Sequence, residues 1–158
     1  MVYQLTQRTD SPVFENQYVT DTIISAQRRH DRYTFGNMST CIGLVGISAV
    51  TKEYTAIHLA PTCNGGEFNL DDVEVVQRVM HPGCEVALFG NIEKWRQNSR
   101  APMEALIERL EVREIFIYAT GAGNYQIRSE DNDELVLYKQ GGDPKSTAWH
   151  RAGSLLSI

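Results

Sequence analysis

The sequence predicts a single domain of the α+β class, with short apolar strands in its core and two main helices beside them. Two amphipathic stretches have a helical period, and several short apolar runs bounded by glycine, proline or asparagine are typical of buried strands. With 158 residues, 42% of them hydrophobic, the chain is long enough for one buried core. We therefore expect residues 1–158 to form one domain.

The clearest β element is a hairpin that starts after Cys41 and ends at His58. Residues 42–50 are apolar and rich in β-branched side chains, residues 51–53 suit a turn, and residues 54–57 are largely apolar again. Glycine inside a strand marks a bulge or a place where another group comes close. Gly43 and Gly46 therefore predict a crowded strand next to Cys41.

The two helices are predicted over residues 71–80 and from about Ser99 onward. Asn69 suits the N-cap of the first helix, which Pro82 ends, and Pro102 fits the first turn of the second. Their apolar side chains recur at helical spacing and predict contacts with the core: Val73, Val76 and Met80 in the first helix, and Met103, Leu106, Ile107 and Leu110 in the second.

The other segments are less strongly patterned. Residues 86–89 and 115–118 read as buried strands, and residues 125–128 and 135–139 as a hairpin. Residues 92–98 are an ambiguous connection. We expect residues 1–33 to be an ordered, β-rich lead-in, in which the apolar run at 18–24 also suits a helix. The polar tail, residues 140–158, has Trp149 and Leu155-Leu156 as docking points.

Composition excludes several classes of partner. The net charge is −5 and Arg28-Arg29-His30 is the only basic cluster, so we expect no nucleic-acid binding. No apolar run reaches the roughly 18 residues that span a bilayer, and residues 1–10 lack the pattern of a signal peptide. We expect a cytoplasmic protein, or an effector exported without a cleaved signal.

Three cysteines form no Cys-x-x-Cys pair, which favours reduced thiols. His58, Cys63, His81 and Cys84 have the side chains that hold structural zinc. Their spacing is irregular for such a site, so we predict no metal and no cofactor.

Cys41 and His58 are the candidate catalytic residues. A thiol is a poor nucleophile at pH 7, and a histidine within hydrogen-bond reach can take its proton and return it to a leaving amine. The same residues also suit a packed core, since free cysteine is among the most buried residue types.

The motif around these residues resembles a known family. Ser39-Thr40-Cys41 is followed, seventeen positions after the cysteine, by His58-Leu59-Ala60-Pro61, and the downstream helices, strands and glycine-containing turn at 120–124 come in the family's order. The chain resembles the CheD-like protein glutamine deamidases of bacterial chemotaxis, within the cytotoxic necrotizing factor-like cysteine hydrolases. The likeness covers about residues 34–142, and the N-terminal residues have no counterpart.

The resemblance implies a layered β-sheet or β-sandwich core and the deamidation of a glutamine in a protein substrate. It implies that Cys41 forms a thioester and that His58 acts as acid and base. The family's third catalytic residue is a threonine six positions before the cysteine, where this chain has Phe35, so we expect Thr34 in that role, with Thr40 or Ser39 as alternatives. An active thiol should react with iodoacetamide before the other cysteines. The alternative function is a catalytically inactive protein-binding module on the same fold.

Overall fold

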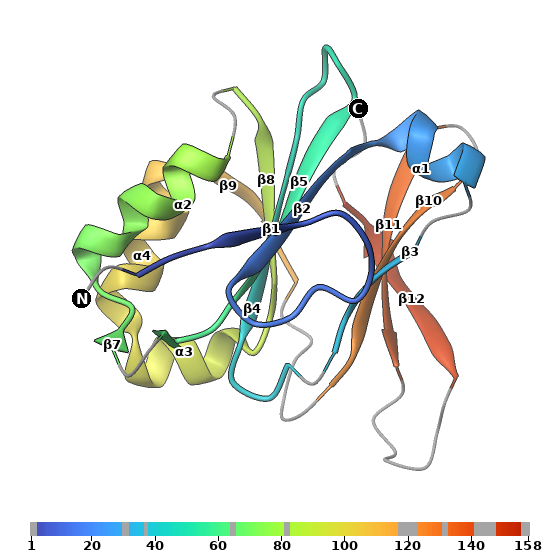
Figure 1. Cartoon of the computed structure of the whole chain (residues 1–158). Helices are drawn as coiled ribbons and strands as arrows, with labels where there is room; N and C mark the ends of the chain where they lie inside the picture. Colours follow the sequence, from blue (N-terminus) through green and yellow to red (C-terminus); the bar gives the residue numbers. More distant parts are fainter. Residues whose placement is uncertain are drawn as a thin grey trace.

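The structure is a computed structural model that describes residues 3–29, 32–36, 38–63, 66–80, 83–116, 123–130, 133–140 and 148–155. It has three layers (Figure 1): helices, a six-stranded sheet, and a four-stranded sheet. The mixture of helices and multi-stranded sheets predicted from the sequence is confirmed.

The six-stranded sheet has the order β1-β2-β5-β4-β8-β9. Its two outer pairs, β1 with β2 and β8 with β9, are parallel, and the inner pairs are antiparallel. Its strands, in chain order, are β1 (Thr6–Arg8), β2 (Gln17–Thr22), β4 (Ile42–Ile47), β5 (Glu53–Leu59), β8 (Glu85–Gly90) and β9 (Val112–Ile115).

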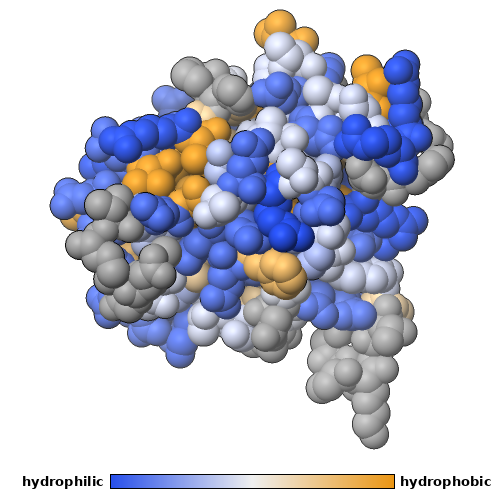
Figure 2. Space-filling model, in the orientation of Figure 1, coloured by the Kyte–Doolittle hydropathy of each residue, from blue (hydrophilic) through white to orange (hydrophobic). Residues whose placement is uncertain are grey.

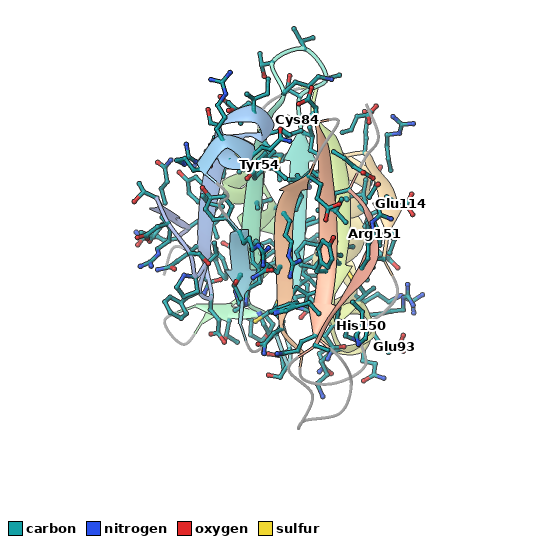
Figure 3. The ribbon with its side chains drawn as sticks, turned by 90° about the vertical axis from the view of Figure 1, so that its right-hand side faces the viewer. Tyr54, Cys84, Glu93, Glu114, His150 and Arg151 are labelled. Carbon is teal, nitrogen blue, oxygen red and sulfur yellow. The ribbon has the colours of Figure 1, made fainter. Side chains whose placement is uncertain are left out.

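The four-stranded sheet is antiparallel and has the order β12-β11-β10-β3. Its strands are β3 (Arg32–Phe35), β10 (Tyr125–Glu130), β11 (Glu134–Gln140) and β12 (Trp149–Ser154). Figure 3 looks onto this sheet, with His150 and Arg151 on its edge strand β12. A small separate pair, β6 (Thr62–Cys63) and β7 (Gly66–Glu67), follows β5.

Three helices cover the face of the six-stranded sheet that points away from the four-stranded one (Figure 1). They are α2 (Val73–Val79), preceded by the 3-10 turn η1 (Leu70–Asp72), α3 (Ile92–Asn98) and α4 (Arg100–Arg109). The fourth helix, α1 (Ile23–Arg29), directly follows β2 and contacts β10 at one end of the molecule.

Two hydrophobic clusters hold the layers together. One lies between the sheets and contains Val45, Ala56 and Phe89 from the larger sheet with Phe35 and Ile127 from the smaller. The other joins the opposite face of the larger sheet to the helices, and its buried members include Ile42, Leu44, Ile57, Val76, Trp95, Met103 and Leu106. Because alternate residues of a strand point to opposite faces, both faces of β4 are buried.

The central hairpin and both main helices are confirmed as β4–β5, α2 and α4. α1 begins within the run at 18–24, for which a helix was the stated alternative to a strand, whereas α3 was not predicted and takes the place of the ambiguous connection. α3 forms because Asn91 caps its first turn, with its side chain 3.1 Å from the Lys94 nitrogen, and because Trp95 is buried against the larger sheet.

The C-terminal segment is more regular than expected, since β12 extends the smaller sheet and Leu155 is buried. Of the strand predicted at 115–118, only Ile115 lies in β9 (Val112–Ile115), and residues 117 and 118 lie outside the described residues. Residues 117–122, and with them most of the predicted glycine turn, lie outside the described residues.

The surface on one side is largely hydrophilic and is broken by a few separate hydrophobic areas (Figure 2). Among the described residues, the exposed large hydrophobic side chains are Phe14, Ile24, Val50 and Leu70, which come from different elements. No helix in the described part of the chain has the length and apolar character needed to cross a membrane.

Candidate functional site

Cys41 lies immediately before β4, where the start of α3 holds the backbone. The carbonyl oxygens of three consecutive residues accept hydrogen bonds from this region: Ser39 from the Asn91 side chain (2.5 Å), Thr40 from the Trp95 indole (2.8 Å), and Cys41 from the Asn91 backbone (2.9 Å). α3 therefore fixes the segment that carries the thiol.

Gly90 allows β8 to approach this segment closely. Its φ is +98°, and a Cβ atom there would lie 2.8 Å from the Cys41 carbonyl oxygen and 2.9 Å from the Ile42 Cα. Only glycine fits such a position without moving the backbone. The close approach that the glycines of the hairpin predicted is also present, because a Cβ on Gly43 would lie 2.1 Å from the Phe89 ring.

His58 lies on β5 and points into the layer between the two sheets. Its strand partner on β4 is Gly43, two residues after Cys41. The neighbours Ala56 and Ala60, which share its face of β5, belong to the same inter-sheet cluster as Cys41. The thiol and the imidazole are thus diagonal neighbours on one face of the larger sheet, an arrangement in which side chains can interact.

The two ring nitrogens of His58 have different surroundings. Nδ1 lies 2.8 Å from the backbone carbonyl oxygen of Val13, whereas Nε2 is buried and has no hydrogen-bond partner. Because a carbonyl oxygen can only accept, the proton sits on Nδ1 and the lone pair is on Nε2. Nε2 of His58 can therefore act as a base, because no hydrogen-bond donor occupies its lone pair.

The segment from Ser11 to Asn16 supplies this carbonyl and is itself held on both sides. The Val13 N–H donates to the Thr34 carbonyl (2.9 Å), and the Asn16 N–H donates to the His58 carbonyl (2.7 Å). The Asn16 side chain also accepts from the Ala60 N–H at 3.1 Å. Residues 1–33, predicted as an ordered, β-rich lead-in, contain β1 and β2, and the segment between these strands also contacts His58.

Glu15, in the same segment, acts on the thiol. Its charge and the hydrogen-bonding capacity of its side chain raise the pKa of Cys41, and its charge also acts on His58. Glu15 was not predicted as a site residue because it lies 26 positions before the cysteine in a segment without a motif.

Electrostatics keep the resting pair neutral. Burial, followed by the charge of Glu15, raises the pKa of the Cys41 thiol to about 12, although Thr40 donates to the sulfur and opposes the shift. Burial lowers the pKa of His58, while the hydrogen bond to Val13 and the charge of Glu15 partly offset that effect. The thiol and the imidazole are therefore both neutral at rest.

The structure does not bring Thr34 to His58. Its neighbours on β3, Tyr33 and Phe35, are buried between the sheets, so Thr34 points to the opposite face, where its hydroxyl accepts from Gln126 at 3.0 Å. The predicted third residue is therefore corrected: the Val13 carbonyl occupies the position beside Nδ1. Phe35 packs near the imidazole instead, with ring centroids 6.0 Å apart.

The two alternatives do not take that position either. Ser39 is exposed, and the Thr40 hydroxyl hydrogen-bonds with the Cys41 sulfur. Thr40 is thus a neighbour of the nucleophile rather than a partner of the histidine.

The four candidate zinc ligands can be followed only in part, because His81 and the Cys63 side chain lie outside the described residues. Cys84 lies before β8, near Gly46, whereas His58 faces the inter-sheet layer from the opposite end of β5. Within the described part of the chain, no three histidine, cysteine, aspartate or glutamate side chains gather as a metal site would require.

No protein-family model matches the sequence, and no curated protein matches it.

Access to the thiol is restricted. Cys41 is 1% exposed and His58 is fully buried, whereas Glu15 beside them is exposed. A substrate side chain can reach the sulfur only after the residues that bury it move aside.

Proposed function

We propose that this chain is a cysteine-dependent amidohydrolase that converts a glutamine side chain of a protein substrate to glutamate. The observation that supports it most is the hydrogen bond from His58 Nδ1 to the Val13 carbonyl, which leaves a buried, unpartnered Nε2 on the face that carries Cys41. A cysteine, a base and a group that orients the base are the parts that nucleophilic catalysis needs.

In the first half-reaction, His58 Nε2 takes the thiol proton as the sulfur attacks the carboxamide carbon. The carbonyl π electrons move to the oxygen, and the Cys41 backbone N–H is a candidate donor to that oxyanion, a contribution of about 3 kcal/mol in comparable sites. The C–N bond then breaks, and the nitrogen leaves as ammonia with the proton from His58.

In the second half-reaction, His58 takes a proton from water, which attacks the thioester carbon. The C–S bond breaks, the proton returns to the sulfur, and glutamate is released. Because both groups start neutral, His58 acts here as a general base during attack rather than as the partner of a preformed thiolate.

The resemblance to CheD-like and cytotoxic necrotizing factor-like hydrolases supports the choice of substrate, a glutamine in a protein. We also propose that the fold is of the same kind as in those hydrolases. It has two packed sheets with helices on one side, and the cysteine and histidine lie at the open end of one hairpin. The chain departs from the CheD pattern in using a backbone carbonyl where a threonine is expected.

The test is a search for glutamine-to-glutamate conversion. Cell lysate is incubated with wild-type protein, Cys41→Ser or His58→Asn, and peptides are scanned for a gain of about one mass unit, with ammonia measured in parallel. The proposal predicts sites that wild type and the matched control Cys84→Ser modify equally, and that Cys41→Ser and His58→Asn leave unmodified. If Cys41→Ser and wild type give the same sites, the enzyme proposal fails.

A binding module without catalytic activity is the second candidate, and the burial of Cys41 and His58 favours it. Under that alternative, a partner is retained equally by wild type and Cys41→Ser, and no partner gains mass.

A further inference from the structure

Glu15 brings a negative charge to the nucleophile although the rest of the site is apolar or neutral. The residue is exposed, yet its carboxylate raises the pKa of the Cys41 thiol, which is buried among inter-sheet residues such as Met38 and Phe89. In the described part of the chain, no lysine or arginine forms an ion pair with it. Its carboxylate is thus available to a polar group that enters the site.

The backbone holds this carboxylate in place. Val13, two residues earlier, is bonded through its N–H to β3 and through its carbonyl to His58, and Asn16, the next residue, is bonded to the His58 carbonyl and to Ala60. Fixed neighbours on both sides limit the movement of Glu15 to its side chain and one or two peptide units. It is positioned by the same contacts that orient the base.

A second observation indicates that a ligand belongs in this place. His58 Nε2 is fully buried without a hydrogen-bond partner, and Glu15 acts on the same imidazole. Buried polar atoms in native proteins are nearly always paired, so an orphan next to a cysteine and a carboxylate is typical of a site completed by another molecule.

The Glu15 carboxylate interacts differently with the substrate and with the product of the proposed reaction. An ionised carboxylate only accepts hydrogen bonds. A carboxamide offers two N–H donors, whereas a carboxylate offers none and carries a like charge.

We infer that Glu15 selects a neutral carboxamide over a carboxylate at Cys41 by accepting a hydrogen bond from the amide nitrogen. This inference rests on the proposed function and adds a specificity-determining residue to it. When the amide N–H takes the place of the thiol S–H at Glu15, the thiol is released to donate to His58 Nε2. After hydrolysis, the product carboxylate is repelled by Glu15, which favours its departure.

Two alkylating reagents reproduce this difference without turnover. Iodoacetamide carries a carboxamide and iodoacetate a carboxylate, and with both reagents the thiolate sulfur forms the S–C bond while iodide leaves. Because both react with the thiolate, the ratio of their rate constants does not depend on the thiolate fraction. The Cys63→Ser, Cys84→Ser background leaves Cys41 as the only thiol, since the chain has three cysteines.

The ratio of iodoacetamide to iodoacetate rate constants is measured for wild type, Glu15→Gln and Glu15→Asp in this background, folded and in urea. For folded wild type, this ratio of rate constants should be at least about fivefold higher than for the same protein in urea. Two unit charges about 4 Å apart in water would produce an effect of that size. Glu15→Gln should lose that excess, and Glu15→Asp, which keeps the charge, should retain most of it. Glu74→Gln, an exposed glutamate on α2, is the matched control and should behave as wild type.

A folded ratio equal to the ratio in urea would overturn the inference, as would a ratio unchanged in Glu15→Gln or a thiol that neither reagent reaches. A loss of selectivity in Glu15→Asp as complete as in Glu15→Gln would also count against it, because charge would then not be the cause. If the selectivity is found but no glutamine is deamidated, the role of Glu15 stands and the proposed function fails.

Discussion

The imidazole Nδ1 of His58 lies 2.8 Å from the carbonyl oxygen of Val13, a residue 45 positions earlier in the chain. This bond joins β5 to the segment before β2 and sets which nitrogen of the ring is free. No side-chain substitution removes the backbone carbonyl of Val13, so the consequences of this hydrogen bond are tested by substituting His58.

The first prediction concerns stability against pH. Burial lowers the pKa of His58 in the folded state, so between that value and the unfolded value of about 6.5 the unfolded chain binds more protons. The contribution of neutral His58 to the free energy of unfolding is therefore fully present above pH 6.5, and it is lost as the pH falls through the folded-state pKa. His58→Asn, which keeps a donor near Nδ1, should flatten this loss.

Urea unfolding at pH 5 to 8 measures the effect. The free energy of unfolding of wild type should fall more steeply toward pH 5 than that of His58→Asn. His150→Asn, on the exposed strand β12, is the control and should follow wild type. Parallel curves for wild type and His58→Asn would show that the histidine is not kept neutral by the fold.

The second prediction compares the two glycines of β4. A Cβ on Gly43 would lie 2.1 Å from the Phe89 ring, and one on Gly46 would lie 2.3 Å from the Met80 sulfur. A packed ring between two sheets has less freedom than a thioether at the end of α2. Gly43→Ala should therefore destabilise the protein by about 1–3 kcal/mol, and by more than Gly46→Ala.

Thermal unfolding of the two variants gives the comparison. Equal losses, or a smaller loss for Gly43→Ala, would contradict the account of a ring packed against this glycine. Gly43→Ala should also reduce any deamidase activity, because the alanine methyl would lie on the sheet face that carries Cys41 and His58, directly opposite His58 on β5.

Local pattern was sufficient to predict the hairpin, the two main helices and the crowding at Gly43 and Gly46. These features depend on residues that are close in sequence, and their apolar spacing is visible directly. Helix α3 was missed because its stability comes from only two buried side chains, Ile92 and Trp95, and from a cap at Asn91 rather than from a long apolar stripe.

The site was predictable only where it coincides with the hairpin. The positions of Cys41 and His58 at the ends of β4 and β5 follow from the strand register, but Val13 and Glu15 reach them through tertiary contacts. Thr34 was chosen by its distance from the cysteine along the chain. Alternation on β3 places Phe35, not Thr34, on the face toward His58, and the existence of β3 was not evident from its sequence.

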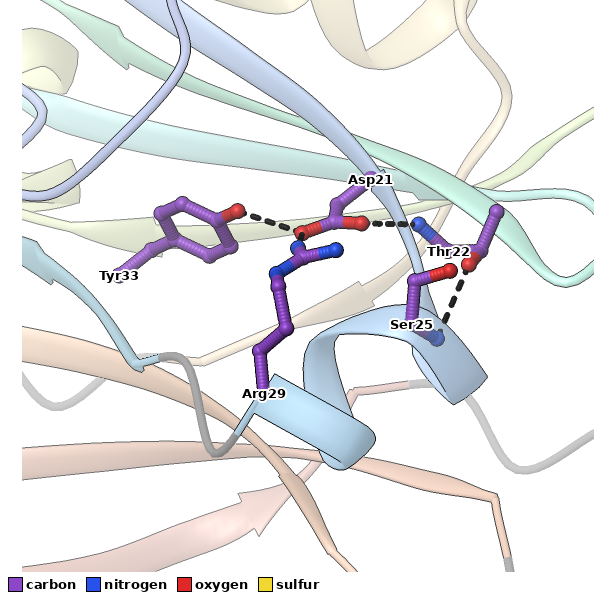
Figure 4. Close-up of polar contacts among 5 residues, drawn as sticks. All are labelled: Asp21, Thr22, Ser25, Arg29 and Tyr33. Atoms are coloured by element: carbon purple, nitrogen blue, oxygen red, sulfur yellow. Dashed lines mark hydrogen bonds and ion pairs between the residues drawn. The ribbon is translucent and has the colours of Figure 1, made fainter.

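The third prediction concerns Asp21, which connects three elements (Figure 4). Its carboxylate accepts hydrogen bonds from Tyr33 on β3, Arg29 on α1 and the Thr22 N–H, and its side chain is 9% exposed. Asp21→Asn removes the charge and at least one acceptor, and should destabilise the protein by about 1–3 kcal/mol.

The control for Asp21 is Glu104→Gln, which removes one partner of the exposed pair Arg100–Glu104 on α4. That change should alter the free energy of unfolding by less than about 0.5 kcal/mol, since exposed ion pairs contribute little. Urea unfolding at pH 7 distinguishes the two variants. A similar small effect for both would mean that the Asp21 cluster does not bind β2, α1 and β3 together.

The fourth prediction concerns the order in which the thiols react. Cys41 is 1% exposed, and burial with the charge of Glu15 raises its pKa to about 12, whereas Cys84 is half-buried. These facts reverse the order expected from the sequence: at pH 8, iodoacetamide should label Cys84 well before Cys41, and labelling of Cys41 should still be rising at pH 10.

The Thr40 hydroxyl donates to the sulfur and favours the thiolate, so Thr40→Val should raise the pKa further and slow the labelling of Cys41 at any given pH. Peptide mapping by mass spectrometry follows each cysteine separately, with Thr6→Val on the exposed strand β1 as the control. Labelling of Cys41 before Cys84 at pH 8 would mean that the thiol is open and ionised at rest, and that Glu15 does not hold its proton.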